Sequence, residues 1–418
     1  TGYTAERKKD ITGSVAVVDM KSMRSIPTGS ATAALQGQAS GVNVISSGVP
    51  GGGSFVFVRG LSSFGNTSPL VLIDGVQGNL NNVNAEEIES IQVLKDAGSA
   101  AIYGVRGANG VIIVTTKKGK AGRTKVTYDA YYGTQRPLPG NPFNLLNVGD
   151  FTEVMKTAYP NAVLFKDGLA DFMYGSPGGS GVAIAGNPLV DPNRYNLDPE
   201  VSSRNYLIQE INKSGTDWFH ETFKPAPMTS HILSASGGSD KSSYLLSLGY
   251  FDQQGTLIET YLKRYSVRIN TLFTPSKNIR IGENAYIYYL DNPSFSNQEQ
   301  FGVMSQVYRM MPVIPVYDIR GNYGGTFAGP DLGGHSNPVA IQKRTVNNRS
   351  HNWNVTGNVF AEADFLSHFT ARTSIGGAID NGYSQGFAFT PYEASQGNSN
   401  PNSYSEGASY GSTLMWTN

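Results

Sequence analysis

The chain has 418 residues and carries 32 basic and 32 acidic side chains, so its formal net charge is zero. Nucleic-acid-binding surfaces need a basic excess, and this balance argues against that class of partner. The absence of cysteine excludes disulfides and thiolate metal sites. No run approaches the ~18 consecutive apolar residues of a transmembrane helix, whereas the alternating strands of a barrel stay possible.

Residues 35–118 predict a compact α+β domain. Short β-rich runs at 55–59, 70–73, 88–94 and 111–116 alternate with glycine-rich turns. Asp74-Gly75 predicts a turn because glycine accepts positive φ without steric cost. Small residues over 96–103 predict a short helix that ends at Gly104. About one hundred residues are enough for a separate core.

Eight short motifs occur in order across this segment. They are Leu35-Gln36-Gly37, Gly41-Val42, Val58-Arg59-Gly60, Leu72-Ile73-Asp74-Gly75, Ile88-Glu89-Ser90-Ile91, Val93-Leu94-Lys95-Asp96, Ala101-Ile102-Tyr103-Gly104 and Gly107-Ala108-Asn109-Gly110-Val111-Ile112. Together they closely resemble the plug domain of TonB-dependent outer-membrane transporters of the SusC/RagA-like class.

Long alternating strands are predicted after this domain, at 125–135, 243–251, 263–273 and 353–365. Within 263–273, Tyr265 and Val267 share one face while Arg264 and Arg268 share the other. Each run has about the ~9–11 residues of a tilted transmembrane strand, and aromatic residues lie near several strand ends. The run 279–290 fits less well because Glu283 falls on its apolar face. A position near the membrane interface, a pairing neighbour or a register-changing bulge would each explain it.

The connections alternate in length, as in bacterial barrels. Tight turns at 237–240, 274–278 and 366–368 are expected on the periplasmic side. Long connections at 136–229, 291–350 and 381–402, with a shorter one at 252–259, are expected outside the cell. Asp150 followed by Glu153 predicts a capping box and a short helix through Tyr159.

The second half also resembles the SusC class, in Asp217-Trp218, Ser236-Gly237-Gly238, Ser247-Leu248-Gly249-Tyr250, Gly255 and the run 264–270. The resemblance implies a plug inside a transmembrane β-barrel of about 22 strands. About eight strands are recognisable here, so we expect the N-terminal part of a longer protein. The predicted division is a linker near the TonB box at 1–14, an α+β plug at 15–122 and the first antiparallel barrel strands at 123–418.

The resemblance implies TonB-dependent import of bulky nutrients, either oligosaccharides or peptides, across the bacterial outer membrane. The implied partners are a SusD-like surface lipoprotein, TonB with its ExbB-ExbD motor, and outer-membrane lipid. Candidate ligand contacts are Phe64, Asn66 and Thr67 in an apex loop, and candidate TonB-coupling residues are Thr1, Gly2 and Tyr3. Charged side chains expected to latch the plug to the wall are Arg59, Glu86, Glu87, Glu89, Arg106, Arg264 and Arg268.

The sequence gives little support to an enzymatic function. The five histidines show no HExxH or other metal spacing, and the glycine-rich run 104–110 lacks the Lys-Ser/Thr of a phosphate loop. We therefore expect neither catalysis nor a cofactor or metal. One alternative is a secreted or surface β-sandwich adhesin that binds glycans without transport. Another is a receptor that signals through an N-terminal extension.

Overall fold

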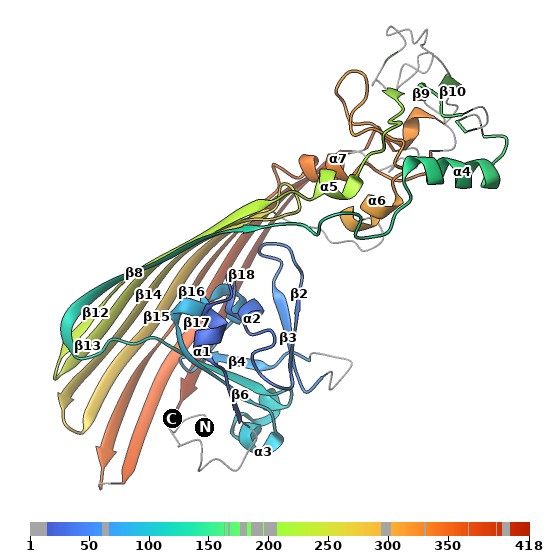
Figure 1. The fold of residues 1–418 in the computed structure, drawn as a ribbon. Coiled ribbons are helices and arrows are strands. Elements are labelled where there is room, and N and C mark those ends of the chain that lie inside the picture. The colour runs from blue at the N-terminus through green and yellow to red at the C-terminus, as the bar shows by residue number, and fades with distance from the viewer. Residues whose placement is uncertain are drawn as a thin grey trace.

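The computed structural model describes residues 15–60, 67–162, 164–165, 168–175, 182–184, 195, 207–293, 302–329, 332–366, 368–389, 391–394 and 402–418. A small α+β domain lies against one face of a curved sheet (Figure 1). Beyond one end of the strands lies a folded unit, here called the cap, which comprises the described parts of 136–225, 293–348 and 389–402. None of the described helices has the length and apolar character needed to span a membrane.

The α+β domain contains a five-stranded sheet in the order β1-β6-β7-β4-β5 and a separate hairpin, β2-β3. Among the described strands of this domain, β4 and β7 alone pair in parallel. Val111, Ile112 and Val114 of β7 are buried, which confirms the strand predicted at 111–116. The strands are β1 Val15–Val17, β2 Val42–Ser46, β3 Ser54–Val58, β4 Leu70–Ile73, β5 Val76–Gln77, β6 Ile88–Leu94 and β7 Val111–Thr116.

Short helices complete this domain: α1 Met20–Arg24, α2 Ala31–Ala34 and α3 Ala97–Ala100. The helix predicted over 96–103 is shorter than expected. Asp96 caps it by accepting a hydrogen bond from the backbone N–H of Ser99, and a 3-10 segment, Ala101–Gly107, follows. Gly104 interrupts that segment with φ 58°, which explains why glycine stands there.

Within the described residues, eight antiparallel strands form the large sheet, in the order β18-β17-β16-β15-β14-β13-β12-β8. All the predicted strands are confirmed, although β17 continues through the start of the loop expected at 381–402. The bounds are β8 Gly122–Gln135, β12 Ala226–Ser239, β13 Ser242–Gln254, β14 Tyr261–Ser276, β15 Ile279–Asn292, β16 Arg349–Phe365, β17 Phe369–Ala388 and β18 Ser403–Thr417.

The two faces of this sheet have opposite character. Arg264 and Arg268 of β14 are buried on the inner face, under the α+β domain. Val355 and Ile379 point outward and are 46% and 49% exposed. A soluble β-sandwich buries its apolar face and exposes its polar one, so the sheet contradicts the adhesin alternative and matches a lipid-facing barrel wall.

Aromatic side chains cross the outer face near the cap. Tyr250, Tyr265, Tyr289 and Trp353 contact one another across four strands, with ring centroids 5.1, 6.2 and 4.7 Å apart. Eight residues further along β14 lies Phe273, which is 55% exposed. The two aromatic levels are therefore separated by ~26 Å along the strand, close to the height of a lipid-facing apolar band.

Glu283 points outward on β15, opposite Thr271 and Val359. The pairing is regular through this residue; the register shift of β14 with β15 lies between Phe273 and Ser276. A bulge at Glu283 is therefore wrong as an explanation. Glu283 stands two residues from Ile281, which pairs with Phe273 at the turn end of the sheet, so the structure favours a position towards the interface.

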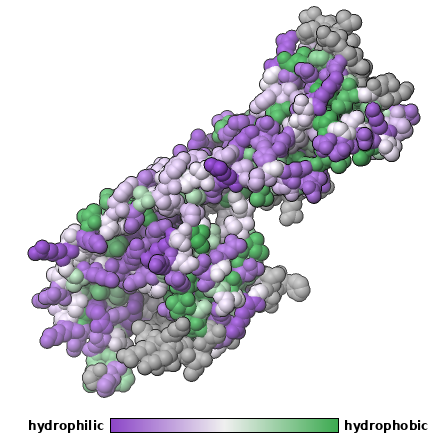
Figure 2. Space-filling view, in the orientation of Figure 1, coloured by the Kyte–Doolittle hydropathy of each residue, from purple (hydrophilic) through white to green (hydrophobic). Residues whose placement is uncertain are grey.

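The cap is a folded unit with its own apolar core, whereas the sequence predicted long loops with one helix. Its core includes Phe165, Trp218, Val307 and Ile314. The elements are α4 Val148–Ala158, β9 Phe172–Gly175, β10 Val182–Ile184, β11 Leu207–Glu210, α5 Trp218–Thr222, α6 Val303–Arg309 and α7 Pro338–Arg344. Figure 2 shows hydrophobic and hydrophilic residues side by side on its visible face.

The helix predicted at Asp150 begins earlier than expected. Asn147 caps α4 by accepting a hydrogen bond from the backbone N–H of Asp150, so the predicted capping box is wrong. Asn147 also donates to the Asp150 carboxylate at 2.7 Å. Asp150 therefore lies in the first turn, where its negative charge complements the helix dipole.

Candidate functional site

A glycine-rich loop, residues 47–53, joins β2 to β3 and brings the α+β domain towards the cap end of the wall. Gly48, Gly51 and Gly53 have φ of 73°, 73° and 75°, a region that other residues rarely adopt. Two backbone hydrogen bonds hold the loop: Gly52 N–H donates to Val49 at 3.0 Å and Ser47 N–H to Gly53 at 3.3 Å. The sequence Ser47-Gly48-Val49-Pro50-Gly51-Gly52-Gly53 therefore forms a compact projection.

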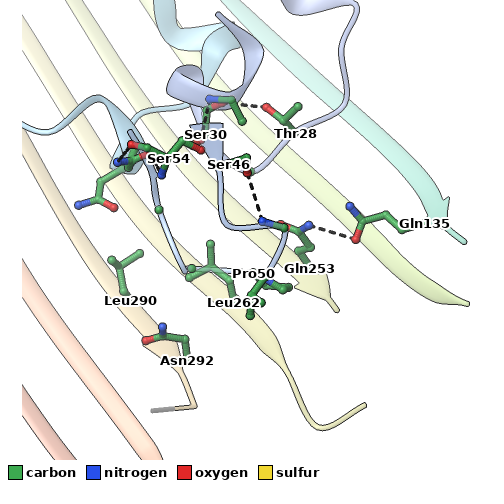
Figure 3. A pocket seen from close by; sticks show the side chains of 18 of the residues that line it. Thr28, Ser30, Ser46, Pro50, Ser54, Gln135, Gln253, Leu262, Leu290 and Asn292 are labelled. Carbon is green, nitrogen blue, oxygen red and sulfur yellow. Dashed lines mark hydrogen bonds between the residues drawn. The ribbon is translucent and has the colours of Figure 1, made fainter. Parts of the chain in front are cut away.

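A cavity of about 210 Å³ lies between this loop and the wall (Figure 3). The loop and its neighbours Thr28, Ser30, Ser46 and Ser54 form one side. The ends of four strands form the other, through Gln135, Gln253, Leu262, Leu290 and Asn292. A ligand in this cavity would contact the α+β domain and the wall at once.

Hydrogen bonds fix several polar groups of the cavity. Gln253 donates from Nε2 to Oε1 of Gln135 at 3.1 Å. Asn81 accepts from the backbone N–H of Ser54 at 3.0 Å and donates to its carbonyl at 3.1 Å. A Cβ added at Gly51 would lie 2.7 Å from Nδ2 of Asn292, so an alanine at this position would displace that side chain. These contacts leave a preorganised polar surface.

Further from the cap than the cavity, two buried arginines of β14 reach into the α+β domain. Arg268 Nε lies 3.3 Å from Glu87 Oε1, and its guanidinium stacks on Tyr286, 4.1 Å from the ring centroid. Arg264 donates to the carbonyl of Gly29 at 2.9 Å and to the side-chain oxygen of Asn84. The structure thus brings together Glu87, Arg264 and Arg268 of the predicted latch.

Three neutral side chains add contacts that the sequence did not predict. Tyr286 donates to the carbonyl of Asn82 at 2.7 Å, and Asn82 Nδ2 donates to Tyr288 at 2.7 Å. Asn358 of β16 donates to the carbonyl of Asp74 at 2.9 Å. All three wall residues lie on the inner face, so the alternation of β15 and β16 is the signal that could have identified them.

Six buried polar atoms at this interface have no hydrogen-bond partner among the described residues. They are Asn84 Nδ2, Glu87 Oε2, Arg264 Nε, Ser266 Oγ, Arg268 Nη2 and Asn270 Oδ1. Unsatisfied buried polar groups cost free energy in the docked state. They therefore reduce the net stabilisation that the directional contacts give to the docked arrangement.

The remaining predicted latch residues have other surroundings. Burial raises the pKa of Glu86, which lies near Lys117 and Arg264. Arg106 donates to Gln77 of β5 within the same domain. The backbone N–H of Arg59 donates to Gly41 at 2.8 Å, and the side chains of Arg59 and Glu89 are exposed. A latching role for these four stays a prediction.

The predicted ligand and coupling residues are only partly described. Thr67 is partly exposed just before β4. Phe64, Asn66, Thr1, Gly2 and Tyr3 lie outside the described residues. In the described part of the chain, the loop that meets the wall at the cap end is 47–53. This loop precedes β3 in the sequence, whereas the predicted apex loop follows β3.

Comparison with known families gives a match to the TonB-dependent Receptor Plug Domain over residues 7–111. The TonB-dependent receptor P26 of Formosa agariphila is 32% identical over 390 residues, which cover 91% of this chain and 34% of the relative. The TonB-dependent receptor SusC of Bacteroides thetaiotaomicron is 28% identical, with 92% of this chain and 36% of SusC covered. The chain thus spans about a third of the length of these curated relatives.

A solved structure of the RagAB peptide importer in its open-open state superposes with a TM-score of 0.78 at 26% identity. The match covers 99% of this chain and 45% of that chain. It includes both the α+β domain and the large sheet, so the sheet is barrel wall and the domain is its plug. The plug match, the receptor relatives and this shared fold identify the chain as a SusC/RagA-like TonB-dependent transporter sequence, with a plug followed by antiparallel barrel strands.

Proposed function

We propose that the protein to which this chain belongs imports bulky polar nutrients, either oligosaccharides or peptides, across the outer membrane. The main observation that supports this proposal is the cavity between loop 47–53 and the wall. Its ligand would touch both parts that must separate for a path to open. The buried Glu87–Arg268 contact lies on the same plug–wall interface, so ligand contacts at one end can be transmitted to the latch.

The proposed partners follow from the relatives. Similarity to SusC and to RagAB supports a SusD-like surface lipoprotein on the cap side, which is then extracellular. The plug supports energy coupling through TonB and its ExbB-ExbD motor. Thr1, Gly2 and Tyr3 are the proposed coupling segment, since a peptide segment can add a strand to the sheet edge of a partner.

The proposed site extends the cavity residues with Phe64, Asn66 and Thr67 as further ligand contacts. The proposed domain division is a linker at 1–14, a plug at 15–122 and barrel wall at 123–418. In this arrangement the apolar outer face contacts lipid and the polar inner face contacts plug and cargo.

Growth of a deletion strain on a panel of single glycans and peptides tests this proposal. We expect loss of growth on one nutrient class, restored by the full-length gene. The protein should also fractionate with the outer membrane and need detergent for extraction. Unchanged growth on every nutrient, together with a detergent-independent protein, would contradict import.

A further inference from the structure

The cavity between loop 47–53 and the wall is polar but uncharged. Its described lining contains asparagine, glutamine, serine, threonine, glycine, alanine, proline, valine and leucine, and no Asp, Glu, Lys, Arg or His. This composition differs from that of the interface below, where Glu87, Arg264 and Arg268 are buried together. The uncharged cavity is therefore a local feature of the cap end.

Two charged groups beside the cavity, those of Arg264 and Asp291, are already engaged or point away from it. Arg264 reaches Gly29, which lines the cavity, but its Nη1 donates to the Gly29 carbonyl at 2.9 Å and the side chain is only 1% exposed. Asp291 precedes the lining residue Asn292 on β15 and therefore points to the opposite face. There it accepts from Tyr261 at 3.1 Å.

We propose that this cavity receives a neutral, hydroxyl-rich unit, namely an uncharged sugar residue of an oligosaccharide. This inference rests on the proposed import function and selects the substrate class within it. An acidic sugar, or the charged terminus of a peptide, would place an ion beside amides and hydroxyls without a counter-charge. Loss of hydration would then be uncompensated, which is costly for an ion.

The polar side chains that line the cavity can form hydrogen bonds with the hydroxyl groups of a sugar. The side chain of Asn292 has no hydrogen-bond partner among the described residues, and Gln135 uses only its Oε1, as an acceptor for Gln253. Carboxamides and hydroxyls offer both donors and acceptors, as sugar hydroxyls require. Leu262 and Leu290 supply apolar surface for the C–H face of a ring.

The size of the cavity agrees with one such unit. A volume of about 210 Å³ is many times the ~10–15 Å³ that one water molecule needs in a cavity. This is room for a single sugar ring, while the rest of a longer chain would extend towards the cap.

Calorimetry on the detergent-solubilised full-length protein tests the inference. The probes are short neutral hexose oligosaccharides and the same oligosaccharides with a terminal hexuronate in place of the terminal hexose. Peptides with free termini and with acetylated and amidated termini form a second matched pair. We expect neutral oligosaccharides to bind about ten-fold or more tightly than their uronate forms. Equal or tighter binding of uronates or free-terminus peptides would overturn the inference.

One substitution links this preference to the cavity. Asn292→Asp adds a charge at nearly constant volume, so binding of neutral oligosaccharides should weaken and that of uronates should weaken further. Asp291→Asn, on the opposite face of the same strand, should leave both affinities unchanged. Equal affinities of the Asn292→Asp and wild-type proteins for every probe would place the ligand elsewhere and overturn the inference.

The growth panel separates the two proposals. A deletion strain that loses growth on peptides or acidic glycans, but keeps growth on neutral glycans, supports import and overturns the neutral-sugar assignment. A strain with no nutrient-dependent defect overturns the import function, and the assignment that rests on it falls as well.

Discussion

Glu87 of the plug and Arg268 of the wall form a single buried contact, with 3.3 Å between Oε1 and Nε and both side chains 3% exposed. The second carboxylate oxygen of Glu87 and Nη2 of Arg268 have no partner among the described residues. A buried ion pair that is only partly satisfied contributes little net stability, yet removal of one partner is costly. The contact therefore favours one plug position without making the docked state very stable.

Glu87→Gln should loosen the plug. The change leaves the Arg268 charge buried without a counter-charge, and such losses cost about 3–5 kcal/mol. Hydrogen exchange of plug amides in the full-length protein should become faster, particularly in β6 and β7. Glu89→Gln is the matched control: because Glu89 is exposed on β6, we expect its loss to change little, contrary to its predicted latching role. Equal exchange in the two variants would argue against the latch.

Gly51→Ala and Gly48→Ala separate backbone strain from contact with the wall. Both glycines have φ of 73°, so both substitutions carry a similar cost of ~1 kcal/mol or more. Only at Gly51 would the new methyl group meet the wall, 2.7 Å from Asn292; at Gly48 nothing lies within 4 Å. We expect Gly51→Ala alone to reduce ligand affinity in calorimetry. Equal affinity losses in the two variants would mean that backbone strain in the loop, and not contact with the wall, weakens ligand binding.

The wall could be predicted because a period of two is visible in a single strand. Tyr265 and Arg264 alternate in the sequence and fall on opposite faces of the sheet, as expected. For the same reason, the sequence could predict that charged side chains of β14 face the plug. Which residues pair could not be predicted, since Glu87 and Arg268 are 181 positions apart and the docking of plug on wall decides their contact.

The cap could not be predicted, because its apolar residues follow no regular period. Trp218, Val307 and Ile314 come from two connections of the wall and meet only in the folded structure. Cavity residues such as Gln135 and Asn292 stand at strand ends, where the sequence shows only polar side chains. Their shared position depends on the curvature and register of the sheet.

A buried ion pair joins two connections of the cap. Arg344 of α7 contacts Glu393 through two hydrogen bonds of 2.8 Å, and Glu393 is fully buried. Arg344→Met should therefore destabilise the cap by about 3–5 kcal/mol, since it leaves a buried carboxylate alone. Limited proteolysis should cut the variant faster. Lys343→Met, which removes the more exposed pair with Glu259, should cost only ~0–1 kcal/mol.

Mild acid should also loosen the cap, through His335. Burial, assisted by nearby Arg309, lowers the pKa of this imidazole below its ordinary value. His335 therefore binds a proton more readily in the unfolded chain than in the folded cap. The stability gained from keeping His335 neutral is complete above pH ~6.5 and is lost as the pH falls towards the folded-state pKa. His335→Asn should remove that part of the pH dependence in proteolysis assays. His220 shifts in the opposite direction, because Asp217 raises its pKa, and His220→Asn should leave the acid sensitivity in place.

The outer face should tolerate a charge according to depth. Ile269 lies midway between the two aromatic levels of β14, whereas Ile281 pairs with Phe273 at the turn end. Ile269→Lys should cost about 2–4 kcal/mol of folding free energy in lipid, and Ile281→Lys about 0–1 kcal/mol, because the second ammonium group can reach the interface. Folding titrations of the full-length protein in lipid vesicles measure both values. A soluble sheet would show no such gradient, so equal costs at the two isoleucines would contradict the assignment of this face to lipid.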